Sequence, residues 1–333
     1  MKRLFVAILL ILHFQAIWGQ QDPQFSMFMF NRQVLNPGYI GSIGMTELIF
    51  AGRSQWVGIE GHPNTGTFSF NTPVPALFGA LGAHLLYDVI GPFTTTALRG
   101  TYAFRLPLGQ RGVALHLGIS PGIYSRVLDA TNFRPQQSAQ LDPVLRDIVG
   151  QTISTTHFDL GFGAYFYKAP QNDRENGPKY YAGFAIDHLL EPSLEKFSPG
   201  YGKDTATFTI ARMFGVMGGY RIDFQGSPIS LIPSIFFKMA GSQMQLDINA
   251  NLHVRPMVFG ISYRGLSNVD ALVGVLGFHA TQRLFVAYSY DYTLSSLGNV
   301  TSGSHEIVVS YTIPKVTRFR PPILDVKSKP DLR

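Results

Sequence analysis

The stretch 243–254, QMQLDINANLHV, alternates strictly between polar and apolar side chains. Successive side chains of a β-strand point to opposite faces, so this pattern gives the strand one apolar and one polar face. The apolar positions are Met244, Leu246, Ile248, Ala250, Leu252 and Val254, and the polar positions are Gln243, Gln245, Asp247, Asn249, Asn251 and His253. Strands of about 10 residues with this alternation are typical of transmembrane β-barrels, in which one face meets lipid and the other meets the lumen.

The same alternation recurs along the chain. Residues 157–167 repeat it with large aromatic side chains, and residues 94–105 turn Arg99 and Arg105 to the same face. The predicted strands are 45–56, 64–72, 78–88, 93–105, 112–124, 155–167, 179–188, 205–222, 229–239, 243–254, 257–266, 269–279, 282–293 and 303–313. Bacterial single-chain barrels have an even number of strands. We therefore predict an all-β fold, a transmembrane antiparallel β-barrel of about 14 strands over residues 45–313.

The connections between these strands differ in length in a regular way. The two longest gaps, 125–154 and 189–204, are the fifth and seventh turns, whereas most even-numbered turns are short. Outer-membrane barrels have long outer loops, short periplasmic turns and a periplasmic N-terminus. This comparison predicts an outer-membrane location with both termini in the periplasm. The sixth turn, 168–178, is an exception, because it is long and polar yet falls on the periplasmic side.

The first residues predict export. Lys2 and Arg3 precede an apolar run over 4–18, and Gly19 comes before a polar stretch. This arrangement is typical of a secretory signal peptide, which we place at residues 1–19. The apolar run is shorter than the about 20 residues that a membrane-spanning helix needs. An uncleaved anchor is the alternative.

The composition differs from that of a soluble domain. Only 14% of the residues are charged and 13% are aromatic, whereas soluble domains have about 25% charged residues. The chain has no cysteine, which excludes disulfides, thiol catalysis and thiolate metal sites.

The formal net charge of +6 is concentrated at the two ends of the chain. Residues 20–314 contain 19 basic and 19 acidic residues, whereas the tail 314–333 is basic and contains several prolines. A nucleic-acid binder carries its basic residues on a folded face, so no nucleic acid is predicted as a partner. The tail is a candidate partner-binding segment, and its alternative is a terminus without a role. Its candidate residues are Lys315, Arg318, Arg320, Lys327 and Lys329.

Residues 20–44 precede the first strand and are polar and aromatic. Fourteen strands enclose a lumen wider than eight strands can fill with side chains, so this segment is the candidate plug. The candidate lumen-lining residues are Arg99, Arg105, His157, Asp159, Gln245, Asp247, Asn249, Asn251, His253 and Glu306. Their charges either form a substrate path or neutralise one another inside a wet or plugged lumen.

Signatures of catalysis and of cofactor binding are missing from the sequence. The stretch 200–204, GYGKD, has neither the spacing nor the hydroxyl residue of a phosphate-binding loop. Ser304 and His305 are adjacent on a predicted strand, so their side chains point to opposite faces and do not form a nucleophile–base pair. We predict no enzyme activity, no cofactor and no metal.

Short motifs along most of the chain resemble the PorP/SprF family of type IX secretion proteins of Bacteroidota. The motifs are QDPQFS (21–26), MFN (29–31), LNPGYIGS (35–42), RSQWVG (53–58), TFSFNTP (67–73), YD (87–88), IGP (90–92), YAFRLPL (102–108), YAG (181–183), DHLL (187–190), YSYDY (288–292) and GSHEI (303–307). The sequence departs from the family at Gly38, where alanine is usual, and in its ending, where a Cys-Pro-Arg-Phe-like terminus is expected.

The resemblance implies an outer-membrane barrel of the secretion machinery, and of the gliding machinery, that acts by binding. The implied partners are outer-membrane lipid, other type IX secretion subunits, periplasmic anchoring proteins and secreted cargo. It implies no catalytic residues. The alternative is an outer-membrane porin or small-molecule transporter, since wide barrels often enclose an aqueous channel.

Overall fold

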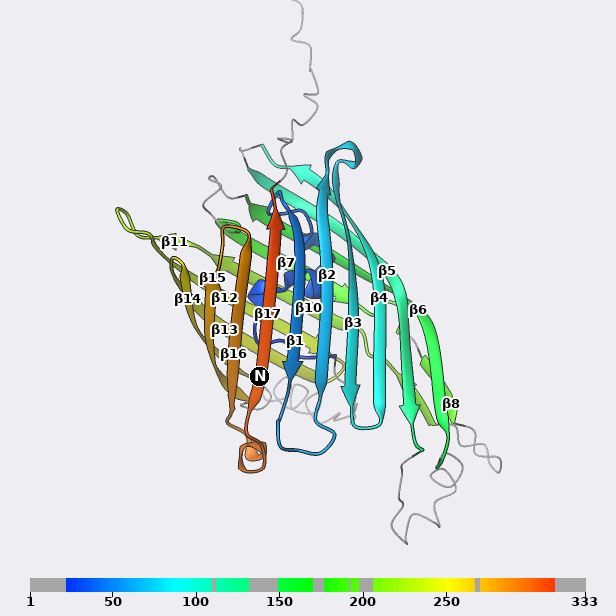
Figure 1. Cartoon of the computed structure of the whole chain (residues 1–333). Helices are drawn as coiled ribbons and strands as arrows, with labels where there is room; N and C mark the ends of the chain where they lie inside the picture. Colours follow the sequence, from blue (N-terminus) through cyan, green and yellow to red (C-terminus); the bar gives the residue numbers. More distant parts are fainter. Residues whose placement is uncertain are drawn as a thin grey trace, which may run out of the picture.

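The computed structural model of the chain describes residues 22–109, 112–131, 149–169, 177–191, 193–197, 206–266 and 270–314, with the backbone alone for 193–197 and 206–209. Antiparallel strands make up most of these residues and form one barrel (Figure 1). The barrel strands are β1 (Thr46–Ser54), β2 (Asn64–Val74), β3 (Gly79–Ile90), β4 (Phe93–Pro107), β5 (Val113–Asp129), β6 (Thr152–Lys168), β7 (Tyr180–Asp187), β10 (Met213–Tyr220), β12 (Ile229–Ala240), β13 (Gln243–Val254), β14 (Met257–Leu266), β15 (Ala271–His279), β16 (Leu284–Thr293) and β17 (Ser304–Ile313).

The barrel is closed. Each strand pairs with the next barrel strand along the chain, and β1 pairs with β17, which places Thr46 opposite Ile313 and Ser54 opposite His305. Closure removes the unpaired edges that an open sheet would expose. The predicted fold class, a 14-stranded antiparallel barrel, is confirmed.

The prediction of one strand over 205–222 is wrong. Within it, β9 (Ala206–Thr209) pairs with β8 (Ser193–Phe197) in a separate two-stranded sheet, and β11 (Ile222–Asp223) is a short extra strand on β12. Arg212 lies between β9 and β10, and its guanidinium donates a hydrogen bond to the Leu189 carbonyl at 3.1 Å. Alternation indicates extended backbone but does not say which strand accepts its hydrogen bonds, so the break was invisible in the sequence.

The two ends of the barrel differ. One end, here the long-loop end, carries the connections 55–63, 91–92, 130–151, 188–212, 241–242, 267–270 and 294–303. The other, the short-turn end, carries 75–78, 108–112, 169–179, 221–228, 255–256 and 280–283, together with Thr46 and Pro314. Both of the longest predicted gaps therefore lie at one end, and the sixth turn is the long exception at the other.

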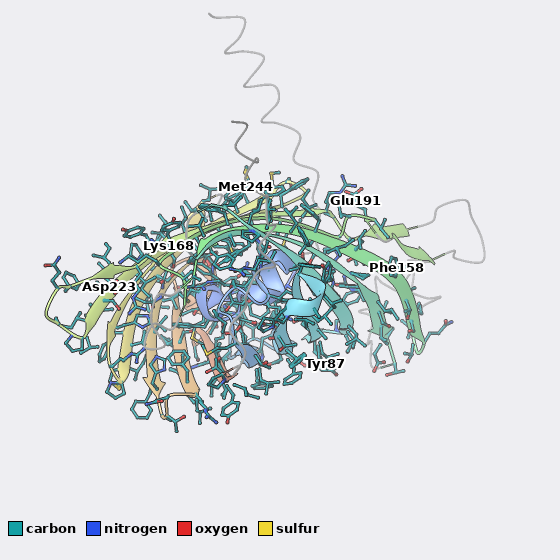
Figure 2. All side chains as sticks on the ribbon, turned by 90° about the horizontal axis from the view of Figure 1, so that it is seen from above. Tyr87, Phe158, Lys168, Glu191, Asp223 and Met244 are labelled. Carbon is teal, nitrogen blue, oxygen red and sulfur yellow. The ribbon has the colours of Figure 1, made fainter. Side chains whose placement is uncertain are left out.

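The outer and inner faces of the strands differ in polarity. Ile248 is 51% exposed on the outer face of β13, whereas Asp247 and Asn249 beside it are 1% and 2% exposed. Large apolar side chains surround the barrel, and Figure 2 shows Tyr87 and Phe158 on the outside of the ring. An exposed apolar band of this kind is what a membrane-spanning barrel presents to lipid. No helix among the described residues has the length and apolarity needed to cross a membrane.

Residues Asp22–Gly44 lie inside the ring of strands (Figure 2). They form three short helical turns, η1 (Phe28–Phe30), α2 (Arg32–Leu35) and η2 (Pro37–Tyr39). The segment begins at the long-loop end, where Asp22 contacts His188, and ends at the short-turn end, where β1 begins. Asp22 and Pro314, the first and last described residues, thus lie at opposite ends of the barrel. The side on which the mature N-terminus lies stays a prediction, because the residues before Asp22 are outside the described part.

Candidate functional site

The lumen is filled by the N-terminal segment. Met27, Phe28 and Ile40 are 0% exposed, and the polar residues Ser26 and Asn36 are buried as completely. Phe28 stacks on Phe236 of β12, with ring centroids 5.5 Å apart. Buried polar side chains are tolerated only where they are hydrogen-bonded, so the contacts of these residues define how the segment is held.

Ser26 is the centre of a buried polar cluster. Its hydroxyl donates to Asp291 Oδ2 at 2.6 Å and accepts from Arg53 Nη1 at 2.7 Å and from Arg264 Nη2 at 2.8 Å. The backbone amides of Ser26 and Met27 donate to the two carboxylate oxygens of Glu306 at 2.6 and 3.2 Å. We call Ser26, Arg53, Asp247, Arg264, Asp291 and Glu306 the Ser26 cluster.

The charges of the Ser26 cluster compensate one another. Arg53 pairs with Asp291 at 2.7 Å and with Glu306 at 3.2 Å, and Arg264 pairs with Asp247 at 2.8 Å and with Asp291 at 3.2 Å. Removing a charged group from water costs roughly several kcal/mol unless opposite charges and hydrogen bonds replace the solvent. The cluster provides these partners. The Ser26 hydroxyl, from the N-terminal segment, accepts a hydrogen bond from each of the two guanidinium groups.

The turn Asn36–Gly38 is seated on the backbone of the barrel wall. Asn36 Nδ2 donates to the carbonyls of Ala164 on β6 and Phe184 on β7, at 3.2 and 3.3 Å. The approach depends on glycine, because a Cβ at Gly163 would lie 2.2 Å from Asn36 Oδ1. Glycines inside strands often mark such close backbone contacts.

Gln33 anchors the middle of the segment on two other strands, β2 and β3. Its Nε2 donates to the carbonyls of Phe70 on β2 and Ala83 on β3 at 3.0 and 2.9 Å, and its Oε1 accepts from Asn71 Nδ2 at 3.0 Å. Asn71 Oδ1 in turn accepts from the Gly41 amide at 3.1 Å. Strands from several sides of the barrel therefore hold the same segment.

A second charged cluster lies where the segment begins. Arg99 contacts Asp159 at 2.6 Å and also Asp187, and His188 contacts Asp159 at 2.6 Å and Asp22 at 3.0 Å. Asp159, Asp187 and His188 present three potential metal-ligand atoms within 4.8 Å of one another. The Arg99 guanidinium already contacts both of these carboxylates, so a cation holds this position without a metal.

Asp22 and His188 have shifted pKa values. Burial alone would raise the pKa of Asp22, but His188, Lys238 and Arg99 hold it at about 2. Burial would lower the pKa of His188, but Asp22, Asp187 and Asp159 raise it well above its ordinary value. Their contact is therefore an ion pair at neutral pH.

The structure brings some of the predicted lumen-lining residues together. Asp247 and Glu306 belong to the Ser26 cluster, and Gln245 donates to Asp247 at 2.6 Å. Arg99 and Asp159 form the second cluster. Asn249 accepts hydrogen bonds from Asn251 at 2.6 Å and from Ser234 at 3.3 Å.

The other candidates lie apart from both clusters. Arg105, His157 and His253 are half-buried on β4, β6 and β13. The tail candidates Lys315, Arg318, Arg320, Lys327 and Lys329, and the predicted signal peptide 1–19, lie outside the described residues. Ser304 and His305 point to opposite sides, because Ser304 Oγ accepts from the Trp56 amide while His305 Nδ1 lies 2.6 Å from the Tyr288 hydroxyl.

The sequence prediction missed several residues that hold the segment. They are Asp22, Ser26, Gln33, Asn36, Arg53, Asp187, His188, Arg264 and Asp291. A signal existed for Arg264, because a two-residue turn between 243–254 and 257–266 sets Asp247 opposite it. Ser26 had no such signal, since its partners come from strands far away in the chain.

The lumen is hollow at both mouths. A cavity of about 550 Å³ at the long-loop end is lined by Asp22, Trp56, Lys238, Gln243 and Leu297, among others. A second cavity, of about 110 Å³, lies at the short-turn end. The two cavities share no lining residue, and the N-terminal segment contributes residues to both.

A closed barrel with an apolar outer band and an internally anchored segment defines an outer-membrane β-barrel protein. The chain belongs to the family of type IX secretion system membrane proteins PorP/SprF, whose model matches residues 17–311. This is a secretion-system family and not an enzyme family.

Several solved structures are similar to this chain at low identity. The outer membrane protein Omp33 of Acinetobacter baumannii is 11% identical, with 81% of this chain and 99% of that chain covered and a TM-score of 0.44. BamA from Haemophilus ducreyi lacking POTRA domains 1–3 is 9% identical, with 81% and 70% covered and a TM-score of 0.42. A Rhodopseudomonas blastica porin mutant is 9% identical, with 81% and 99% covered and a TM-score of 0.32. No curated protein matches the chain.

Proposed function

We propose that this outer-membrane barrel acts in type IX secretion by binding cargo or partner subunits at its mouths. The observation that carries the proposal is the buried attachment of Asp22–Gly44 inside the lumen. A segment fixed by the Ser26 cluster, Gln33 and Asn36 leaves the two mouths, rather than a central channel, as the surfaces on which the protein works.

The alternative is a porin or small-molecule transporter. An open pore requires a continuous aqueous path, and the completely buried side chains of Met27, Phe28 and Ile40 oppose one. The absence of shared lining residues between the cavities at the two mouths also favours docking over passage.

The proposed orientation places the long-loop end outside the cell and the short-turn end in the periplasm, as in other bacterial barrels. Cargo then meets the long-loop end, and other secretion subunits and periplasmic anchoring proteins meet the short-turn end. Lipid surrounds the apolar outer band. We extend the proposal to a role in gliding.

The basic tail Lys315–Arg333 is part of the proposed docking face. It follows Pro314 at the short-turn end and carries six basic and two acidic residues. Such a segment binds an acidic surface in a salt-dependent manner.

Two measurements on the full-length protein test the proposal. Affinity purification from detergent-solubilised envelopes should co-elute other secretion-system components, and reconstitution in planar bilayers should give no steady open-channel conductance. Large, constant conductance together with the absence of secretion components would support the porin and overturn docking.

A further inference from the structure

The cavity at the short-turn end is lined by both polar and apolar residues. Its volume is about 110 Å³, and it lies between the N-terminal segment and strands β12, β13, β15, β16 and β17. Its polar lining residues include Arg32, His253, His279 and Arg283, and its apolar ones include Phe30, Ile232 and Phe285. Glu47 is the acidic residue among its lining residues.

Arg32 forms no ion pair at salt-bridge distance among the described residues, although the Glu47 carboxylate is close enough to stabilise its charge. Its guanidinium lies over the Tyr181 ring at 4.3 Å from the centroid and over the Tyr39 ring at 5.7 Å, and its buried Nε has no hydrogen-bond partner there. Stacking on aromatic faces orients a guanidinium, and its unpartnered Nε donor remains able to bind an acceptor.

The hydrogen bonds of the Glu47 carboxylate come from other residues. Its two carboxylate oxygens accept from the Tyr39 hydroxyl at 3.2 and 3.0 Å, and one of them also accepts from Asn71 Nδ2 at 3.1 Å. The carboxylate is therefore hydrogen-bonded to the N-terminal segment and to β2.

Positive charge gathers around the cavity. Three arginines, Arg32, Arg221 and Arg255, lie close enough to His253 to act on it electrostatically. Arg221 is neutralised by Asp223 at 2.6 Å, on the short extra strand. Arg283 lies exposed in the turn between β15 and β16 and forms no ion pair within the described part of the chain. The described groups around the cavity thus carry more positive than negative charge.

We propose that this cavity binds the carboxylate of an acidic side chain of a partner polypeptide, with Arg32 and Arg283 as its cationic ligands. This inference rests on the proposed docking function and names the site for the periplasmic partner. A planar guanidinium matches a carboxylate in a bidentate manner. The apolar wall of Phe30, Ile232 and Phe285 accepts a hydrophobic neighbour of that acidic residue.

Position and size favour a polypeptide side chain over a lipid. The cavity is walled by the inner faces of the strands, whereas lipid meets the outer face, and it lies at the mouth that carries Pro314. One water molecule needs about 10–15 Å³ of cavity volume. A cavity of about 110 Å³ therefore accepts one side chain and not a folded domain.

Fluorescence anisotropy on the full-length protein in detergent tests the site. The probe is a fluorescein-labelled hexapeptide of four glutamates and two phenylalanines, and the matched peptide replaces glutamate with glutamine. The acidic probe should bind at least tenfold more tightly than the neutral one. Arg32→Gln and Arg283→Gln should each weaken acidic binding about tenfold, as expected for the loss of one charge-assisted hydrogen bond. Arg212→Gln, at the long-loop end, is the control and should change nothing.

Each other outcome has a defined meaning. Equal binding by wild type and both variants would overturn the site, because the peptide would then bind elsewhere, such as on the basic tail. Equal affinity for the two peptides, or displacement of the acidic one by inorganic phosphate at the same concentration, would overturn the assignment to a carboxylate side chain. Arg283 is exposed, and its replacement leaves the packing of Arg32 unchanged. If the Arg32→Gln variant misfolds, the Arg283→Gln variant alone still decides the test. Capture of secretion components by wild type, measured separately, decides whether the proposed function itself fails.

Discussion

Ser26 Oγ donates a hydrogen bond of 2.6 Å to Asp291 Oδ2, although the two residues are 265 positions apart. The same hydroxyl accepts from Arg53, whose strand pairs with the last strand of the barrel. The N-terminal segment is therefore attached on both sides of the seam where β1 meets β17. The attachment is complete only after the barrel has closed, so the segment and the closed barrel stabilise each other.

Removing the Ser26 hydroxyl should destabilise the protein. Ser26→Ala leaves the buried Arg53, Arg264 and Asp291 each one hydrogen-bond partner short, which should cost about 1–3 kcal/mol. Ser295→Ala is the matched control, because the Ser295 hydroxyl is buried without a partner among the described residues. Urea unfolding in detergent compares the two. Equal losses of stability would contradict the anchoring role of Ser26.

A charged side chain on the outer face of β13 should destabilise the barrel, and more strongly near the middle of the strand than near its end. Ile248→Arg places a cation in lipid near the middle of the strand, at a cost of about 2–4 kcal/mol, whereas Met244→Arg near the strand end should cost about 0–1 kcal/mol. Heat-modifiable gel mobility after refolding into lipid vesicles measures the folded fraction. Similar damage from both would mean that this face does not cross the bilayer.

A side chain at Gly163 should displace the Asn36 turn. Gly163→Ala places a Cβ where Asn36 Oδ1 now lies, 2.2 Å away, so the turn must shift or the strand must bend. Such overpacking typically costs about 1–3 kcal/mol. Gly66→Ala is the control, because nothing lies within 4 Å of a Cβ there. Limited proteolysis should cleave within residues 22–44 in the Gly163 variant and not in the control. Protection of this segment in both variants would contradict the close contact between Asn36 and Gly163.

The Asp22–His188 pair should make stability depend on pH. The pKa of Asp22 is lowered from 3.8 to about 2, so its contribution is present above pH 3.8 and is lost as the pH falls toward 2. The pKa of His188 is raised well above 6.5, so its contribution is complete below pH 6.5 and is lost as the pH rises through the raised value. The thermal-unfolding midpoint of wild type should exceed that of His188→Gln most between pH 3.8 and 6.5. A difference that stays constant up to pH 10 would argue against the ion pair.

Deleting Lys315–Arg333 should separate assembly from docking. The deleted residues follow Pro314, after the last strand, so heat-modifiable mobility should remain that of the wild type. Capture of secretion components from envelopes should fall, and the loss should be largest at low salt, where charge is least screened. If the truncated barrel captures the same partners at equal yield, the tail has no docking role.

Alternation and turn length predicted most of the barrel, because both act locally. The period-two pattern of 243–254 places Asp247 inside and Ile248 outside, and the two-residue turn that follows sets Asp247 opposite Arg264. The same logic failed at 205–222, where the hydrogen bonds of β9 go to β8 and not to the barrel. A residue's own pattern does not encode the identity of a distant hydrogen-bond partner.

The sequence by itself determined the class of fold, the number of barrel strands, the two faces of each strand and the resemblance to a secretion family. Only the tertiary structure decided that Ser26 joins Arg53 and Asp291, that Asn36 rests on Gly163, and that Arg32 and Arg283 line one cavity. The physical reason is that these contacts arise when a closed barrel surrounds a buried segment. They depend on the path of that segment through the lumen and not on the periodicity of any strand.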